Sequence, residues 1–280
     1  MLRTRVVTAV VLLLVVVGLL FFAPPGAWAL FVLAIALAGC WEWSRLCGFT
    51  PGQQSIYLLL SGVLGGAFWM LHLRASEEMF RNIMLSALVL ATLFWVLVAP
   101  LWLRFGWRPA PWPAALAGWI VLWPTWFALV ALREIGPWVL LAVAAVVWVA
   151  DIAAYFAGRR FGKRKLAPAV SPGKSWEGVY GALVGVAVYG AILAIVAQSV
   201  STPLAPVFKP AFGSIAIVAM LLLTALSVVG DLLESWMKRG AGRKDSSRLL
   251  PGHGGVLDRI DALTSTLPVA ALAISLARGP

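Results

Sequence analysis

Charged residues are scarce in this sequence, and acidic residues are the scarcest of them. Of the 280 residues only 12% are charged, and Asp and Glu together number 11. Roughly a quarter of the residues of a soluble domain carry charge. This shortage, with 62% of residues hydrophobic, excludes an ordinary soluble fold. No polar stretch is long enough for a second folded unit, so we expect a single membrane domain.

Cysteine and histidine are also rare, with two of each. Cys40 and Cys47 lie on one predicted helix, two turns and about 10 Å apart, which is too far for a disulfide. Neither belongs to a metal-ligand spacing, so we expect free, buried thiols. One histidine cannot make a zinc site. His72 is expected to be structural, whereas His253, which lies between glycines in a polar turn, is a candidate functional residue.

Long apolar runs are what the sequence does have. A membrane-spanning helix needs about 20 mostly apolar residues, and nine stretches qualify. The predicted spans are 6–23, 27–42, 56–73, 83–103, 113–132, 137–157, 176–198, 212–237 and 260–277. We therefore predict an all-α fold, a polytopic membrane bundle of about nine helices. The second stretch is short, so a re-entrant or tilted segment is an alternative there. No persuasive cleavage site follows the first stretch, which we interpret as a retained span.

The positive charge is unevenly placed across these spans. When the chain is threaded through these spans, seventeen of the 22 Lys and Arg residues fall on one side of the membrane. The other five are Arg74, Arg81, Arg133, Lys209 and Arg278. This bias predicts a cytoplasmic N-terminus and an external C-terminus. It suits anionic headgroups or nucleotides, so we expect membrane lipids and no nucleic acid as partners. The absence of targeting extensions favours a bacterial inner membrane.

Polarity is also uneven along the chain. Residues 1–135 carry few charges, whereas the second half contains two polar segments, 151–177 and 231–261. We predict an N-terminal scaffold of spanning helices at 1–135 and a catalytic half at 136–280. Seven of the 11 acidic residues lie in the two polar segments, where carboxylates near lipid usually face a partner, an ion or water. Solvation at helix ends or loops explains the other four, Glu42, Glu77, Glu78 and Glu134.

The second polar segment has the residue types of a phosphate site. Asp231, Ser235 and Lys238 follow an i, i+4, i+7 pattern and share one helix face. The turn at Gly254-Gly255 lets backbone N–H groups approach an anion. Asp258 and Asp261 begin the last span three residues apart, on one face. Bases, amides and carboxylate oxygens together suit a complex of Mg²⁺ with a polyphosphate.

The first polar segment carries Asp151 and Tyr155 at i, i+4, directed toward the cytoplasmic end of its span. Gly173-Lys174-Ser175 is not a phosphate-binding P-loop, because Pro168 stands where that motif needs glycine and no preceding strand is plausible. We expect a polar loop with anion-binding bases. Ser171 or Ser175 can cap the seventh span, a structural role as well supported as a catalytic one.

These residues resemble the signature of the phosphatidate cytidylyltransferase (CDP-diacylglycerol synthase) family. The similar pattern is Ser235-x-x-Lys238-Arg239-x4-Lys244-Asp245-x5-Pro251-x-His253-Gly254-Gly255-x-x-Asp258-Arg259-x-Asp261. The segments Asp151-x-x-Ala-Tyr155-x-x-Gly158 and Ser171-Pro172-Gly173-Lys174-Ser175-x-Glu177-Gly178 also look like that family. The resemblance covers roughly 151–261; Ser175 stands where threonine is often found, which keeps the hydroxyl.

The resemblance implies that CTP and phosphatidic acid give CDP-diacylglycerol and pyrophosphate, with Mg²⁺ required. It implies Asp231 and Asp258 as metal ligands, with Asp261 nearby, and K⁺ as a second cation. The candidate catalytic residues are Asp231, Asp258, Lys238, Lys244 and His253. The candidate residues for binding substrate phosphates are Ser171, Lys174, Ser175, Ser235, Arg239, Gly254, Gly255 and Arg259. Which bases bind CTP and which bind the lipid stays open, as does a homodimer.

Three other classes of protein compete with this interpretation. A transporter of an anionic solute also uses intramembrane carboxylates, but here the acidic residues gather at one membrane face and no repeat relates the two halves. The CDP-alcohol phosphotransferases, also Mg²⁺-dependent, have a pattern that is not found here. A noncatalytic scaffold would leave the polar cluster unexplained.

Overall fold

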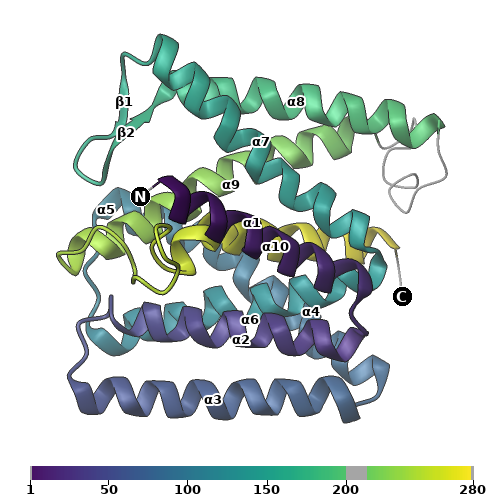
Figure 1. Ribbon diagram of the computed structural model, residues 1–280, viewed down its shortest axis with the longest axis vertical. Helices are drawn as coiled ribbons and strands as arrows, with labels where there is room; N and C mark the ends of the chain where they lie inside the picture. Colours follow the sequence, from purple (N-terminus) through teal and green to yellow (C-terminus); the bar gives the residue numbers. More distant parts are fainter. Residues whose placement is uncertain (1, 200–212, 279–280) are drawn as a thin grey trace.

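The computed structural model describes residues 2–199 and 213–278 as an almost wholly helical bundle (Figure 1). The spans are helical because in lipid each backbone N–H and C=O must find its partner within the segment. The helical elements are α1 (Leu2–Phe22), α2 (Pro25–Ser44), α3 (Pro51–Arg74), α4 (Glu77–Leu93), η1 (Phe94–Val98), α5 (Ala99–Phe105), α6 (Pro111–Ile135), α7 (Pro137–Phe161), α8 (Trp176–Ser199), α9 (Gly213–Gly240) and α10 (Leu257–Arg278).

Nine helices among the described residues are long and apolar enough to cross a membrane, which confirms the predicted fold class. One of the nine spans is composite, because α4, η1 and α5 run on from one another over Glu77–Phe105. The π-helical turn η1 directly precedes the Ala99-Pro100 step that begins α5. Proline has no N–H to donate to the preceding turn, so the local hydrogen-bond pattern changes there.

Helix ends lie where the sequence supplies breakers and caps. The side chain of Thr50 accepts a hydrogen bond from Gln53 N, and the side chain of Gln53 accepts one from Thr50 N, a capping box that begins α3. The side chain of Ser76 caps α4 in the same position. Gly106 ends α5 with φ 62°, a left-handed conformation that favours glycine.

Tryptophan-rich packing joins α2 to α6 at the centre of the bundle. The Trp28 indole donates to Leu129 O at 3.0 Å, and the Trp126 indole donates back to Ala29 O at 2.9 Å. The Trp43 indole donates to Ala114 O at 2.8 Å. These bonds satisfy buried donors and fix α2 along its length against α6. The C-terminal turn of α2 is therefore a rigid support.

The second predicted span, in which a re-entrant or tilted segment was an alternative, is a helix of 20 residues, α2. It lies beside α3 along most of its length (Figure 1). The predicted span was too short because it ended at the charged residue Glu42, whereas the helix continues to Ser44. The predicted start of the eighth span, residue 212, and Lys209 lie outside the described residues.

The polar loop expected in the first polar segment contains a hairpin. Two short strands, β1 (Lys165–Ala167) and β2 (Ser171–Ser175), pair antiparallel as a hairpin that projects beyond the helices. A strand does therefore precede Gly173, contrary to one of the two reasons given against a P-loop. The other reason stands, because residue 168 is proline.

Both cysteines are free and buried, as predicted. Cys47 lies just after α2, where burial raises the pKa of its thiol to about 12. The thiol therefore stays protonated at neutral pH and is unreactive.

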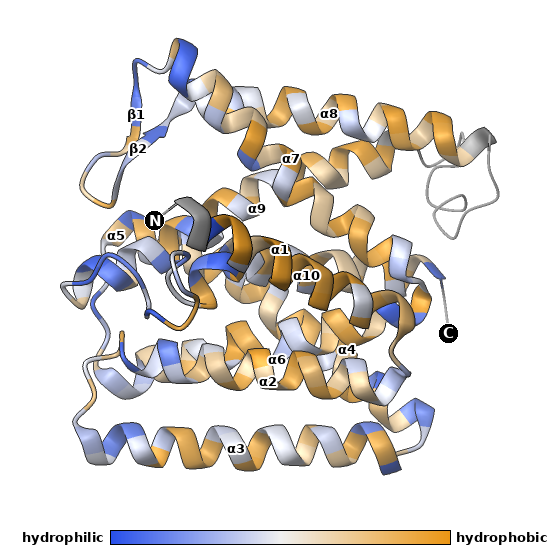
Figure 2. Cartoon of the chain, in the orientation of Figure 1, coloured by the Kyte–Doolittle hydropathy of each residue, from blue (hydrophilic) through white to orange (hydrophobic). Residues whose placement is uncertain are grey.

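Charged residues concentrate at the end of the bundle that holds the hairpin, the loop 241–256 and the start of α1 (Figure 2). Hydrophobic residues cover the helices between the two ends, as in an integral membrane protein. We call the end that holds the hairpin, the loop 241–256 and the start of α1 the polar end. Its cytoplasmic location, and the division into a scaffold and a catalytic half, stay predictions.

Candidate active site

The two polar segments meet at the polar end of the bundle. The end of α7 and the hairpin come from the first segment, and the end of α9, the loop 241–256 and the start of α10 come from the second (Figure 1). They come together because α7, α8, α9 and α10 alternate in direction, so that these ends fall on one side. The sequence places the candidate residues on these elements, and the structure brings several of them into contact.

Asp231 lies on α9, and a lysine of the hairpin pairs with it. Its carboxylate forms an ion pair with Lys174 of β2, and Ser235 Oγ, one turn later, donates to it at 3.3 Å. Asp151 on α7 and Asp261 on α10 are both close enough for their charges to interact with Asp231. Asp231 is thus the point where three helices and the hairpin converge.

Asp258 is held by four donors at the first turn of α10. One carboxylate oxygen accepts from Lys238 Nζ at 2.7 Å. The other accepts from Gly255 N at 2.8 Å and from both the backbone N and the Oγ of Ser246 at 3.0 Å. The carboxylate also lies at the N-terminus of the helix, where negative charge is favoured. Asp258 is therefore both nearly buried and tightly fixed in direction.

The expectation that Glu42 is solvated at a helix end is wrong. The side chain is fully buried at the end of α2. One oxygen accepts from Ser247 Oγ and from Val256 N at 2.9 Å. The other accepts from Leu257 N at 2.7 Å and lies 3.1 Å from Ser246 Oγ, whose single proton it shares with Asp258. The carboxylate has replaced water with donors of the loop 241–256, which folds over the end of α2.

The glycine turn has less room for a substrate than the sequence suggested. Gly254 has φ 80°, which favours glycine. A Cβ on Gly255 would lie 2.0 Å from Ser246 Oγ and 2.4 Å from Glu42 Oε1. The amides after the turn do meet anions, as predicted, but these anions are the carboxylates of Asp258 and Glu42.

Carboxyl groups outnumber ammonium groups in this cluster. Lys238 bridges Glu234 and Asp258, and Lys174 pairs with Asp231. The five carboxylates are Asp151, Asp231, Glu234, Asp258 and Asp261, so two ammonium groups face five acids. Glu234 Oε1 is buried and has no hydrogen-bond partner among the described residues. We call these seven residues the acidic cluster.

The other predicted bases lie around the acidic cluster rather than in it. Arg239 donates to Val170 O at 3.3 Å and to Arg243 O at 3.2 Å, which ties α9 to the hairpin. Arg259 donates to the backbone O of His253 at 3.0 Å. Lys244 is exposed in the loop after α9. The His253 ring lies 3.4 Å from Pro251 O.

The hairpin carries the remaining candidates. Ser175 Oγ accepts from Gly178 N at 3.2 Å, which confirms the predicted cap at the start of α8. Ser171 pairs with Ala167 across the hairpin. Glu177 accepts from the backbone N of Lys163 at 3.1 Å and pairs with Arg164, so it closes the base of the hairpin.

Sequence reasoning missed three residues of this region. Ser246 and Ser247 are buried and donate to Asp258 and Glu42, yet serine in a polar loop gives no signal of its own. Glu42 does give a signal in the sequence, because it is an acid at the end of an apolar run with a tryptophan on either side, Trp41 and Trp43. Only the folded loop shows that this acid is covered.

The fold and the site define a class: polytopic membrane proteins with a fixed cluster of carboxylates and lysines at one membrane face. Residues 3–277 match the family described as "Cytidylyltransferase family". The chain belongs to the cytidylyltransferase family and is a nucleotidyltransferase.

Curated relatives agree over nearly the whole length. A phosphatidate cytidylyltransferase of Pseudomonas aeruginosa is 42% identical over 274 residues, which are 97% of this chain and 96% of that protein. One from Haemophilus influenzae is 37% identical over 287 residues, covering 96% of each. One from Thermotoga maritima is 38% identical over 156 residues, covering 55% of each.

Proposed function

We propose that this protein transfers the cytidylyl group of CTP to phosphatidate, giving CDP-diacylglycerol and pyrophosphate for phospholipid synthesis. The observation that carries the proposal is the similarity, over nearly the whole chain, to proteins named phosphatidate cytidylyltransferase. The site supports it with a fixed cluster of acids and lysines at the level where a lipid headgroup and a water-soluble nucleotide can meet.

The acidic cluster is suited to a divalent cation. Five carboxylates face two ammonium groups, and Glu234 Oε1 is buried without a partner among the described residues. Carboxylate oxygens are the ligands that Mg²⁺ prefers. Among the described residues, no group of three His, Cys, Asp or Glu side chains is already arranged around a metal position. Lys174 and Lys238 instead occupy the carboxylates that would hold it.

We assign Mg²⁺ to Asp231 and Asp258, with Asp261 nearby, and a second cation, K⁺, to the same cluster. The ion would neutralise charge on the triphosphate and on the leaving pyrophosphate. Lys174 and Lys238 are the cations that the structure places on these two carboxylates. We assign them to substrate phosphates once a metal takes over the carboxylates, because an ammonium group also binds phosphate oxygens.

The reaction needs no strong general base. A phosphate oxygen of phosphatidate, already anionic, bonds to the α-phosphorus of CTP while the bond from that phosphorus to the β-phosphate oxygen breaks. The chain's task is to hold both phosphates in line and to neutralise their charge. The rigid network around Asp258 suits that task. His253 has no acid partner among the described residues, which fits a reaction without a proton relay.

We place the polar end in the cytoplasm of a bacterial inner membrane. Basic residues cluster at this end, and cytoplasmic segments carry an excess of Lys and Arg. CTP would then reach the acidic cluster from water and phosphatidate from the adjoining leaflet.

Purified protein in detergent is expected to release pyrophosphate only when CTP, phosphatidate and Mg²⁺ are all present. EDTA should stop the release, and excess Mg²⁺ should restore it. An enzyme turns over without a sealed membrane, whereas a transporter of an anionic solute needs two compartments. Failure to release pyrophosphate by a well-folded sample in several detergents, together with solute uptake in vesicles, would replace this proposal with the transporter interpretation.

A further inference from the structure

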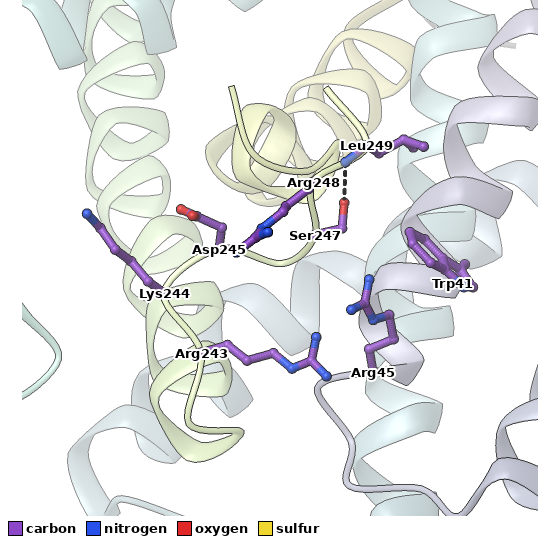
Figure 3. Close-up of a pocket in the computed structure, with 8 residues that line it drawn as sticks. All are labelled: Trp41, Arg45, Arg243, Lys244, Asp245, Ser247, Arg248 and Leu249. Carbon is purple, nitrogen blue, oxygen red and sulfur yellow. Dashed lines mark hydrogen bonds between the residues drawn. The ribbon is translucent and has the colours of Figure 1, made fainter. Parts of the chain in front are cut away.

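A basic pocket of about 720 Å³ opens beside the acidic cluster, between the end of α2 and the loop after α9 (Figure 3). Arg45, which follows α2, and Arg243 and Arg248 of the loop 241–256 line it, together with Trp41, Lys244, Asp245, Ser247 and Leu249. The pattern of polar residues in 231–261 did not single out Arg45, Arg243 or Arg248. We call this cavity the arginine pocket.

Four basic side chains and one carboxylate, that of Asp245, line the arginine pocket, which gives it the net positive charge of an anion site. Arg243 extends from the loop after α9 toward Arg45, which follows the last residue of α2 and lies over the Trp41 ring (Figure 3). Within the part of the chain that the structure describes, neither of them forms an ion pair, nor does Arg248. Guanidinium groups that face one another repel unless an anion lies between them. Because each presents a planar fork of donors, they match the oxygens of a phosphate.

The floor of the arginine pocket is continuous with the acidic cluster. Ser247 lines the pocket and donates to Glu42, while its neighbour Ser246 donates to Asp258. One residue therefore separates the wall of the pocket from the carboxylate assigned to the metal. A phosphate held by the arginines would lie next to that carboxylate.

The rim of the arginine pocket suits a lipid rather than a free nucleotide. Trp41 is half-buried and carries the Arg45 guanidinium 4.8 Å above its ring. Leu249 is 49% exposed at the mouth. Tryptophan is enriched at the level of lipid headgroups, and Trp41 lies in the last turn of α2, at the end of a spanning helix.

We propose that the arginine pocket binds the phosphomonoester headgroup of phosphatidate, with the glycerol part against Trp41 and Leu249. The proposal takes its substrate from the proposed function. A phosphomonoester carries up to two negative charges near neutral pH and has three free oxygens, enough to face several guanidinium groups. This leaves the triphosphate of CTP to the lysines of the acidic cluster.

The test compares Arg45→Gln and Arg248→Gln with the wild type in mixed micelles of detergent and dioleoyl phosphatidate. Each variant should raise the KM for phosphatidate about tenfold, the loss of one charge-assisted contact, and leave the KM for CTP within about twofold. Arg45→Lys should fall between, since it keeps the charge and loses the fork. Arg104→Gln is the matched control, because Arg104 is an exposed base at the polar end outside the pocket.

A second readout separates this inference from the proposed function. Binding of a fluorescent phosphatidate, measured without CTP, should weaken in Arg45→Gln and Arg248→Gln but not in Arg104→Gln. Arginine-dependent binding by a protein that makes no CDP-diacylglycerol would support the pocket and contradict the proposed function. An active protein whose variants keep both KM values, or whose KM rises for CTP instead, would overturn the inference.

Discussion

Asp231→Asn is expected to lower turnover by at least about 1,000-fold, the size of effect seen when a key electrostatic group leaves an active site. Asparagine keeps the shape of the side chain but removes the charge that pairs with Lys174 and that we assign to Mg²⁺. The fold should survive. Asp231 and Lys174 are partly exposed, with side chains 31% and 25% accessible, and such an ion pair is worth about 1 kcal/mol or less.

The measurement is the initial rate of pyrophosphate release at saturating Mg²⁺, with thermal unfolding recorded on the same samples. Glu134→Gln provides the matched loss of one carboxylate, at an exposed position near the opposite end of the bundle. It should keep wild-type activity. If Asp231→Asn turned over at a rate near that of the wild type, the metal assignment would be wrong.

Glu42→Gln is expected to lower kcat/KM about 100-fold, although Glu42 touches no substrate in our account. Each carboxylate oxygen of Glu42 faces one backbone N–H, from Val256 or from Leu257. A glutamine must therefore turn its own NH₂ toward one of them, leaving a buried donor unsatisfied. The loop that holds Asp258 through Ser246 would shift, and misplacement by about 1 Å can cost that factor.

The check on Glu42 combines kinetics with hydrogen exchange of the loop. Exchange at residues 246 and 255–257 should accelerate in Glu42→Gln while exchange in α6 stays slow, which separates local release of the loop from global unfolding. Glu42→Asp, which restores the charge, should recover part of the activity. Glu78→Gln, the same change on an exposed surface, is the control. Unchanged kinetics and unchanged exchange in Glu42→Gln would show that Glu42 does not position the loop.

The helical framework could be predicted from the sequence because lipid imposes a simple rule. Runs of apolar residues between breakers such as Pro24-Pro25 and Gly136-Pro137 correspond to the helices of the structure within a few residues. The common end of the two polar segments followed from counting spans, since each crossing reverses direction. The location of Asp231, Ser235 and Asp258 at this end could therefore be predicted by type and position, while their roles stay predictions.

The partners of these residues could not be predicted in the same way. Lys238 shares the expected helix face with Asp231, yet it pairs with Glu234 and Asp258. Lys174 reaches Asp231 only because 165–175 forms a hairpin. Glu42 is more than 200 positions from the serines that bind it, at |i−j| of 204 and 205. Such long-range contacts depend on how the loop 241–256 folds over α2, and no periodicity in one sequence reports that.

The transfer of the cytidylyl group is tested by following the phosphorus atoms of CTP. Purified protein with phosphatidate and Mg²⁺ is given CTP labelled either at the α-phosphorus or at the γ-phosphorus. Attack by the lipid phosphate on the α-phosphorus predicts that the α label moves into the lipid product, while the γ label stays in water as pyrophosphate. A γ label in the lipid, or no label from either position in a folded and metal-loaded sample, would contradict the assignment of this chain as the enzyme that makes CDP-diacylglycerol.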